Sequence, residues 1–360
     1  MHFPLGVGFS TTMYSERRQS KLAQKKIVVT GGAGYIGSVL TKEALSRGYE
    51  VHVVDRLFFG NQGLDKLGAI LHNEDTRSMP AHILDNTYAV LDLAAISNDP
   101  AGDLNPTITM DINFRARRRL QELCLQKGVE RYVLASSCSV YGFQDVVVSE
   151  ESEVNPLTVY AEANIKAEQS AFSLRNEGTT FTALRQATVF GLSPRMRFDL
   201  VVNAMALNVS RGLDLRILRD GEQWRPMIHV RDTSNAFLEV IEQPSALVDG
   251  EVFNTGADSQ NHKILDLATR VSSALGSDLK LDWYGDPDHR SYKVSFEKIY
   301  TRLGFKTEWD VERGAKEIAL ALSLGEVTDG PETKTLTWYQ SLSRQTNVLK
   351  DSKFPSGGPF

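Results

Sequence analysis

The chain has 360 residues, 41% of them hydrophobic, which is enough for one extended α/β unit or two modest domains with a substantial core. Its 40 basic and 45 acidic residues give a net charge of −5, which argues against a nucleic-acid or membrane-surface partner. Its two cysteines form no disulfide framework and show no metal-ligand spacing. No apolar run reaches the roughly 18 residues that a membrane span needs. We therefore expect a cytoplasmic globular protein without a metal site.

The first informative segment is Lys26–Gly37, in which a short apolar run breaks into three glycines and then resumes at helical spacing. This pattern predicts a strand, a tight turn and a helix start. Gly31 permits the turn, Gly34 lets the backbone approach a phosphate, and Gly37 lets the helix pack closely on the strand. The unpaired N–H groups of the first helical turn then face an anion. Glycine turns of this kind without a ligand are common, so the motif alone is a weak signal.

A second strand strengthens the interpretation of the glycine turn. Residues 50–55, Glu-Val-His-Val-Val-Asp, have the pattern of a strand that ends in an acid. Asp55 lies about twenty residues after the turn, where a carboxylate accepts hydrogen bonds from adenosine ribose hydroxyls. This position favours NAD over NADP because a carboxylate repels a 2′-phosphate, although Arg56 beside it argues partly the other way. Together the two segments predict a dinucleotide-binding domain.

Short β-branched runs alternate with longer helical patterns as far as Gly191. The expected strands are 26–30, 51–55, 69–72, 88–93, 131–136 and 180–185, and the expected helices lie near 36–47, 107–127 and 159–177. Alternation at this spacing predicts parallel strands with crossover helices, which is a doubly wound α/β sheet of the Rossmann type. The densest basic run lies on the second helix, where such a run is typical of a solvated face; it comprises Arg115, Arg117, Arg118 and Arg119.

Beyond Gly191 the alternation loosens. Helical patterns at 198–211 and 263–275 and strand patterns at 213–218 and 251–254 predict a smaller cap over the C-terminal strand ends, where open sheets bind ligands. We therefore expect four parts: a flexible extension at 1–24, a cofactor-binding domain at 25–191 with returning segments near 226–258, a substrate-binding cap at 192–340 and a flexible tail at 341–360.

Hydroxyl groups follow directly on the strand at 131–136. Ser136 and Ser137 lie at its C-terminal end, and about twenty residues later Tyr160 opens a predicted helix with Asn164 four residues further on. With the glycine turn, Leu93-Ala94-Ala95 and the segment 225–230, this pattern resembles the extended short-chain dehydrogenase/reductase family. More narrowly, it resembles the NAD-dependent nucleotide-sugar epimerases and dehydratases, from about Lys26 to Tyr339.

The resemblance implies that Tyr160 is an acid/base that removes a sugar hydroxyl proton while hydride goes to the nicotinamide. Ser137 would hydrogen-bond the same oxygen. The pairing is chemically sensible, because hydride departure leaves a developing carbonyl and a phenolate is a competent base if its pKa is lowered. The alternative is that Tyr160 merely opens a helix and Ser137 caps a turn.

Asn164 departs from the family pattern, which carries lysine at this position. On a helix, residues i and i+4 share a face, so the lysine holds the nicotinamide ribose and lowers the tyrosine pKa. Asparagine keeps the hydrogen bond but not the charge. Lys166 cannot replace the lysine, because six residues along a helix place it on a different face from Tyr160. The charge of the oxidised nicotinamide remains available. Three consequences stay open: a slower enzyme, a more alkaline optimum, or a binding protein without turnover.

Cys138 and Ser139 help to sort the reaction. In the family's 4,6-dehydratases an Asp-Glu pair stands there, so the acid/base pair for loss of the 6-hydroxyl is missing here. A 4-epimerase needs neither residue, because it oxidises C4, lets the keto-sugar rotate and returns hydride to the other face. The sequence therefore favours an epimerase, with a dehydratase, decarboxylase or reductase as the alternative. Cys138 is either an acid/base beside the transient ketone or, the preferred interpretation, a buried thiol.

The resemblance also implies the remaining contacts of the site. The catalytic set is Tyr160, Ser137, Asn164 and Cys138. Cofactor contacts fall at Gly31, Gly34, Tyr35, Ile36, Gly37, Asp55, Asp75, Thr76, Leu93, Ala94, Ala95, Asn113, Ser136, Tyr160 and Asn164. Substrate contacts fall at Ser97, Asn98, Ser137, Arg197, Asn203, Arg225 and Arg290, of which the last two would grip a pyrophosphate. The usual histidine before Leu93 is Asp92 here. Family members often form homodimers through the two long helices, near 107–127 and 159–177.

Overall fold

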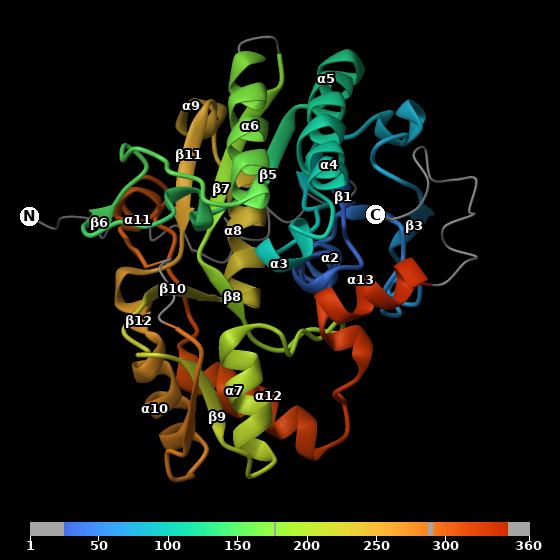
Figure 1. The fold of residues 1–360 in the computed structure, drawn as a ribbon. Coiled ribbons are helices and arrows are strands. Elements are labelled where there is room, and N and C mark those ends of the chain that lie inside the picture. The colour runs from blue at the N-terminus through green and yellow to red at the C-terminus, as the bar shows by residue number, and fades with distance from the viewer. Residues whose placement is uncertain (1–24, 176–177, 287–290, 345–360) are drawn as a thin grey trace, which may run out of the picture.

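Seven parallel strands form the central sheet of the computed structural model, which describes residues 25–175, 178–286 and 291–344 (Figure 1). The strand order is β11 (Glu251–Thr255), β7 (Thr180–Gln186), β5 (Arg131–Ser137), β4 (Ala89–Asp92), β1 (Lys26–Thr30), β2 (Glu50–Asp55) and β3 (Ile70–Asn73). All six neighbouring pairs are parallel, which confirms the doubly wound α/β fold.

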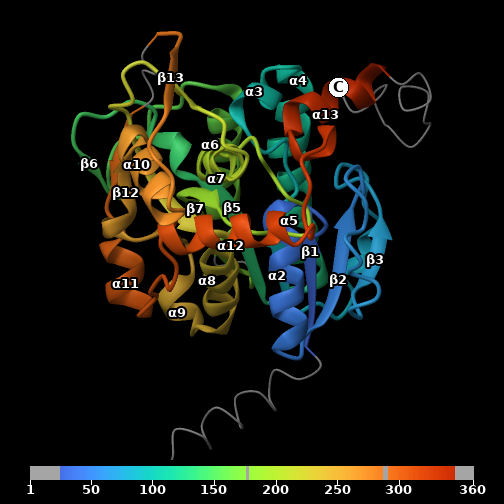
Figure 2. The same cartoon turned by 90° about the horizontal axis from the view of Figure 1, so that it is seen from below.

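Side chains that alternate along β1 pack into two separate cores. Ile27 and Val29 join a cluster with α2 (Tyr35–Ser46) and α8 (Val230–Glu242), which cover one face of the sheet. Val28, between them, joins a cluster with α5 (Arg117–Lys127) and α6 (Val159–Ser173) on the other face (Figures 1 and 2). Because successive side chains of a strand point to opposite faces, a strand covered on both sides reads as a continuous apolar run.

The chain reverses its direction of travel across the sheet at β1. It first moves outward through β2 and β3, and then returns to pair β4 with the other edge of β1. In open α/β sheets the crevice outside the carboxyl ends of two such strands is the ligand site. The topology therefore points to the ends of β1 and β4.

A smaller set of elements lies beyond the C-terminal ends of the strands. A three-stranded sheet comprises β12 (Asn261–Lys263), β10 (Trp224–His229) and β8 (Thr188–Phe190). Two further pairs are β9 (Leu215–Leu218) with β13 (Leu281–Tyr284), and β6 (Val147–Val148) with β14 (Lys293–Val294). The helices α7 (Val201–Ser210), α10 (Ile264–Ala274) and α12 (Val311–Ser323) pack against one another there (Figure 1). The shorter helices are α3 (Asp99–Gly102), α9 (Ser245–Val248) and α11 (Glu297–Leu303).

The expected strands of the sheet match the observed ones to within one residue at either end. The expected helix at 107–127 is a composite of α4 (Pro106–Met110), a π-helical turn at Asp111–Ala116 and α5. Of the segments near 226–258, β11 joins the large sheet and α8 packs against α2, β5 and β7, whereas β10 lies in the three-stranded sheet. The division into domains remains a prediction. The expected extension at 1–24 lies outside the described residues, as does residue range 345–360 of the expected tail.

The first four residues of the expected tail, 341–344, instead form the end of α13 (Thr335–Arg344). Leu342 is buried in a small cluster with Ile96 and Ile108, and the indole Nε1 of Trp338 donates to the carbonyl oxygen of Phe58 at 2.7 Å. Figure 2 shows α13 lying beside α3 and α4, two helices that are far from it in the sequence. These contacts anchor the C-terminal helix next to the crevice.

We expect Leu342→Ala to lower the free energy of unfolding by about 2 to 5 kcal/mol, because it removes buried methyl groups and leaves a cavity. The exposed Thr337 on the same helix is the matched control, and Thr337→Ala should change stability by no more than about 0.5 kcal/mol. Urea unfolding of both variants measures the difference. Equal stabilities would show that α13 is not anchored through its buried face.

Candidate active site

A cavity of about 620 Å³ opens at the ends of β1, β4 and β5. Its lining combines most of the cofactor and substrate residues expected from the sequence: Gly31, Gly34, Tyr35, Ile36, Gly37, Asp55, Asp75, Thr76, Leu93, Ala94, Ala95, Ser97, Asn98, Ser136, Ser137, Tyr160, Arg197 and Arg225. Four expected residues are absent from the lining, namely Asn113, Cys138, Asn164 and Asn203. Arg290 lies outside the described residues. The roles themselves remain predictions.

The β1–α2 turn closes one side of the cavity by a close approach of backbone to backbone. Gly31 has a φ of +66°, and a Cβ atom there would lie 2.9 Å from the backbone nitrogen of Ala94. Gly34 begins α2 without a side-chain cap, so the first-turn N–H groups have no side-chain acceptor at this position. These amides, together with the positive end of the helix, suit a pyrophosphate. The residues present therefore fit a dinucleotide.

Two carboxyl groups line the cavity beside this turn. Asp55 accepts hydrogen bonds from the backbone nitrogens of Ala33 at 3.1 Å and Leu57 at 2.8 Å. Burial raises the pKa of Asp55, and these two bonds act against the rise. Asp75 accepts from the backbone nitrogen of Arg77 at 2.9 Å and from its Nη2 at 2.7 Å. Both carboxyl groups are thus held in fixed orientations at the end expected to receive adenosine.

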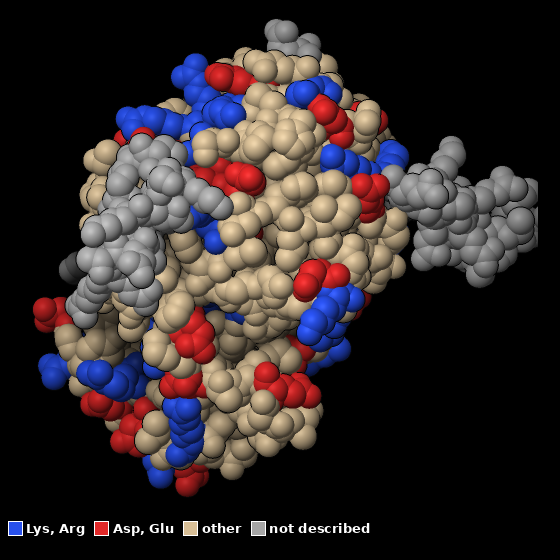
Figure 3. Space-filling view, turned by 90° about the vertical axis from the view of Figure 1, so that its right-hand side faces the viewer, with Lys and Arg blue, Asp and Glu red and all other residues tan. Residues whose placement is uncertain are grey.

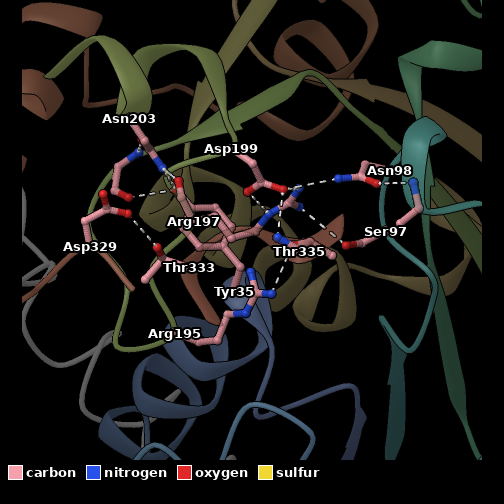
Figure 4. A network of polar contacts seen from close by, with 12 residues as sticks. Tyr35, Ser97, Asn98, Arg195, Arg197, Asp199, Asn203, Asp329, Thr333 and Thr335 are labelled. Carbon is pink, nitrogen blue, oxygen red and sulfur yellow. Dashed lines mark hydrogen bonds and ion pairs between the residues drawn. The ribbon is translucent and has the colours of Figure 1, made fainter. Parts of the chain in front are cut away.

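Helix α13 supplies a wall that the sequence did not indicate. Leu336 and Tyr339 line the same cavity as the glycine turn. Arg195 lines the cavity beside them, and its guanidinium stacks 3.7 Å from the ring centroid of Phe59. Its Nη2 donates to Thr335 Oγ1 at 3.0 Å (Figure 4). No local sequence motif predicts these contacts, because they join the loop after β8 to α13, the last helix of the described chain.

Arg197 lies at the centre of a polar network that reaches the start of α13 (Figure 4). Its Nε and Nη2 donate to the two carboxylate oxygens of Asp199 at 2.9 and 3.0 Å, and its Nη1 donates to Ser97 Oγ at 3.4 Å. Asn98 Nδ2 and the backbone nitrogen of Thr335 donate to the same carboxylate at 3.3 and 3.2 Å. Two of the expected substrate residues, Arg197 and Asn98, therefore donate to one carboxylate that sequence reasoning missed, and Ser97 joins the network through Arg197.

Asn203 was expected to contact the substrate, but its amide is buried and fully engaged by the protein. Its Nδ2 donates to the hydroxyl of Tyr35 at 3.0 Å and to the carbonyl of Arg197 at 2.9 Å, and its Oδ1 accepts from Gly191 N at 2.9 Å. It holds Tyr35 and Arg197 in place from behind the wall. We therefore correct its expected role from contact to support.

Asn113 also lies behind the wall. Its Oδ1 accepts from the backbone nitrogen of Ile96 at 2.9 Å, and its Nδ2 donates to the carbonyl of the same residue at 3.0 Å. This pair of bonds fixes the loop after β4.

Arg225 lines the cavity, with its Nη1 donating to the carbonyl of Trp224 at 2.9 Å and its Cζ 5.7 Å from the ring centroid of Tyr292.

Ser137 and Tyr160 come from separate elements and line the cavity together. Ser137 ends β5, and its Oγ accepts from the backbone nitrogen of Ser139 at 3.1 Å. Tyr160 lies in the first turn of α6, which Thr158 caps by accepting from the backbone nitrogen of Ala161 at 3.2 Å. Burial raises the pKa of Tyr160, while the charge of Arg117 lowers it. The chemistry of a phenol base needs such an opposing charge.

Cys138 is a core thiol rather than a cavity residue. It is 1% exposed, and its Sγ donates to the carbonyl of Arg185 at 3.2 Å. Burial raises the pKa of this thiol well above its usual range, which keeps it protonated. The placement supports the preferred interpretation of a packed thiol and gives no support to an acid/base role, so we correct the catalytic expectation for Cys138.

The basic run on α5 is not uniformly solvated. Arg118 is exposed and pairs with Glu122 at 3.1 Å, but Arg117 is only 2% exposed. Its Nη1 donates to Asn164 Oδ1 at 2.8 Å and its Nη2 to the carbonyl of Ala135 at 3.2 Å. The expectation of a solvated face is therefore wrong for Arg117. Its four-residue spacing from Asn113 was the available signal, since that spacing places two residues on one helix face.

In the part of the chain that the structure describes, no helix is long and apolar enough to span a membrane. Across the same described ranges, no three His, Cys, Asp or Glu side chains are grouped where they would hold a metal ion.

Comparison with known proteins identifies the family. The model of the NAD dependent epimerase/dehydratase family matches residues 27–256, and the chain belongs to this family. UDP-glucuronic acid decarboxylase 1 of Xenopus tropicalis is 27% identical over 310 residues, covering 82% of this chain and 71% of the relative. UDP-glucose 4-epimerase of Lactobacillus helveticus is 27% identical over 305 residues, covering 78% and 92%.

Solved structures extend the similarity to three dimensions. The crystal structure of UDP-glucose 4-epimerase from Thermotoga maritima with UDP-glucose has a TM-score of 0.76 at 25% identity, covering 84% of this chain and all of that chain. The extended short-chain resemblance is therefore confirmed. The family comprises NAD-dependent nucleotide-sugar epimerases, dehydratases and decarboxylases, and NAD is the cofactor.

We expect Asp55→Asn to weaken NAD binding by about tenfold, because it removes the charge of an acceptor placed for the ribose hydroxyls. Calorimetric titration of cofactor-free protein measures the change. Glu50 is exposed at the start of the same strand, so Glu50→Gln is the matched control and should leave NAD affinity unchanged. Equal affinity in the two variants would remove Asp55 from the cofactor site.

Proposed function

We propose that this chain is a nucleotide-sugar 4-epimerase that retains NAD and ends each turnover with the cofactor unchanged. The observation that carries the proposal is the presence of Tyr160 and Ser137 in one cavity with the glycine turn, without a carboxyl pair at positions 138 and 139. Tyr160 and Ser137 suit the oxidation of a secondary alcohol. The lack of a carboxyl pair at positions 138 and 139 argues against the elimination of water.

The chemistry that NAD supplies when bound is reversible acceptance of a hydride. Tyr160, as phenolate, accepts the proton of the sugar 4-hydroxyl, while the Ser137 hydroxyl donates a hydrogen bond to the same oxygen. The keto-sugar then rotates within the cavity so that its opposite face meets the returning hydride. Tyr160 gives the proton back to the oxygen as the alcohol reforms. Proton and hydride each return to the sugar, so atoms and electrons balance with no co-reactant.

Decarboxylation is the nearest rival, because several of the similar proteins are named as decarboxylases of nucleotide-linked uronic acids. A uronic acid brings a carboxylate that needs a donor in the site. Arg197 is the obvious cation at the sugar end, but Asp199 already engages its guanidinium at 2.9 and 3.0 Å. This pairing supports a substrate with a neutral sugar. A non-catalytic binding protein is the other rival, and Asn164 in place of lysine is the feature that favours it.

Incubation with UDP-glucose, with product sugars resolved by chromatography, tests the proposal. We expect interconversion of two sugars with no net change in reduced nicotinamide absorbance. Release of carbon dioxide from UDP-glucuronic acid would favour the decarboxylase instead, and a net absorbance change a reductase. Retention of NAD without product from any uridine, guanosine, cytidine or thymidine conjugate would favour a binding protein.

Tyr160→Phe should lower turnover by about 10² to 10⁴-fold and leave NAD bound, because it removes the proton acceptor but not the ring. Tyr300 is exposed and does not line the cavity, so Tyr300→Phe is the control and should match the parent rate. Turnover of Tyr160→Phe at the parent rate would exclude Tyr160 from the mechanism.

A homodimer through α5 and α6 remains part of the proposal. The two helices lie side by side on one face of the sheet (Figure 1), and their outer surfaces carry the ion pairs Arg118–Glu122 at 3.1 Å and Glu162–Lys166 at 2.7 Å. Such an interface would be polar, so we expect dimer dissociation to increase with salt. Sedimentation velocity at low and high salt measures this, and a monomer at both would refute the dimer.

A further inference from the structure

Arg117 is a buried cation that the proposed reaction does not yet use. It extends from the start of α5 to the wall of the active-site cavity, and only 2% of it is exposed. A buried guanidinium keeps its charge and loses its hydration, so it persists only where partners compensate it. Its partners are therefore informative about what the charge does.

Three elements converge on this guanidinium. Nη1 donates to Asn164 Oδ1 at 2.8 Å on α6, and Nη2 donates to the carbonyl of Ala135 at 3.2 Å on β5. Nε lies 3.9 Å from Asp92 Oδ2 at the end of β4. Asp92 is itself fixed, because it accepts hydrogen bonds from Thr30 Oγ1 at 2.5 Å and from the hydroxyl of Tyr132.

We propose that Arg117 supplies the fixed positive charge of this active site, holding the Asn164 amide beside Tyr160 and favouring the phenolate. Arg117 is thus a positioning residue that acts on Tyr160 from one helix away. The inference rests on the proposed role of Tyr160 as the base. It goes further by dividing the role of the lysine that the resemblance implies at position 164 between two residues. Asn164 supplies the hydrogen bond, and Arg117 supplies the charge.

The geometry of the amide supports this division. Because Oδ1 of Asn164 accepts from Arg117 at 2.8 Å, Nδ2 is the remaining donor of the amide, and it is buried without a hydrogen-bond partner within the described residues. Asn164 lies one helical turn from Tyr160 and lowers the pKa of its phenol. A donor next to the phenol favours its ionised form. If the amide were turned over, it would present an oxygen and oppose ionisation.

The charges around Tyr160 act in both directions. Burial raises the pKa of Tyr160, and Asp99 on α3 adds to the rise. Arg117 is the largest contribution that lowers it, followed by Asn164 and Ser137. Arg197 is another cation of the cavity that interacts with Tyr160, but it is paired with Asp199. Removal of Arg117 would therefore leave burial and Asp99 opposed only by weaker groups.

The inference also accounts for two departures from the family pattern with one interaction. Asp92 and Asn164 stand where the resemblance implies a histidine and a lysine, and Arg117 lies between the two side chains. A lysine at position 164 would put a second cation beside the buried guanidinium, which costs free energy by like-charge repulsion. We therefore expect the single variant Asn164→Lys to give no gain in turnover at neutral pH.

The experiment follows the ionisation of Tyr160 itself in cofactor-free protein. The ultraviolet absorbance of tyrosinate is titrated in each variant with and without Tyr160→Phe, so that the difference reports Tyr160 alone. We expect Arg117→Gln to raise the midpoint by about one pH unit or more, and to lower turnover at neutral pH about tenfold or more. The acidic limb of the pH–rate profile should move to higher pH by the same amount.

Three further variants separate charge from packing. Arg117→Lys keeps the charge and should hold the midpoint closer to the parent than Arg117→Gln does. Adding Asn164→Lys to Arg117→Gln should return the midpoint toward the parent. Arg118→Gln is the matched control, since Arg118 is the exposed neighbour on the same helix, and it should leave the midpoint unchanged.

An unchanged midpoint in folded Arg117→Gln protein, or no return on adding Asn164→Lys, would overturn the inference. If Arg117→Gln does not fold, Asp92→Asn decides, because removing the counter-charge should lower the midpoint and an unchanged or higher midpoint refutes the inference. The titration needs no substrate, so its failure differs from failure of the proposed function. A shifted midpoint in a protein that converts no sugar would leave the inference standing and remove the epimerase.

Discussion

The architecture depends on the close approach of the β1–α2 turn to the chain leaving β4. A Cβ atom on Gly31 would lie 2.9 Å from the backbone nitrogen of Ala94, so the two segments touch at the point where the sheet order reverses. This contact places the amino end of α2, the end of β4 and the small residues Ala94 and Ala95 around one crevice. A dinucleotide suits that crevice because backbone groups, rather than long side chains, form its wall.

The parts of the fold that local pattern determines were predictable from the sequence. The strand limits follow from apolar runs buried on both faces, and the glycine turn follows from its own spacing. What escaped prediction depends on distant contacts. Asn203 is a polar residue of the kind that binds ligands, yet its amide donates to the hydroxyl of Tyr35, which lies on an element far along the chain. The π-helical turn at Asp111–Ala116, which precedes Arg117, has no signature in residue types.

Arg117 shows why a run of charges is poorly interpreted one residue at a time. Arg115 and Arg118 face solvent, whereas Arg117 passes beneath the helix to reach Asn164 and Ala135. Sequence composition describes the average residue of such a run, and burial is decided by which helix face meets the sheet. Asp92 carries the same lesson, since an acid at the end of an apolar strand is stable there only if a cation approaches from another element.

Helix α13 couples the wall of the active site to a small core that lies outside the central sheet. Leu336 and Tyr339 line the cavity, and Tyr339 and Leu342 of the same helix are buried in a cluster with Ile96 and Ile108. Ile96 follows Ala94 and Ala95, which line the cavity on the other side of this cluster. A substitution that loosens the cluster would therefore disturb the shape of the nucleotide crevice from two sides, even though it touches no group that takes part in the chemistry.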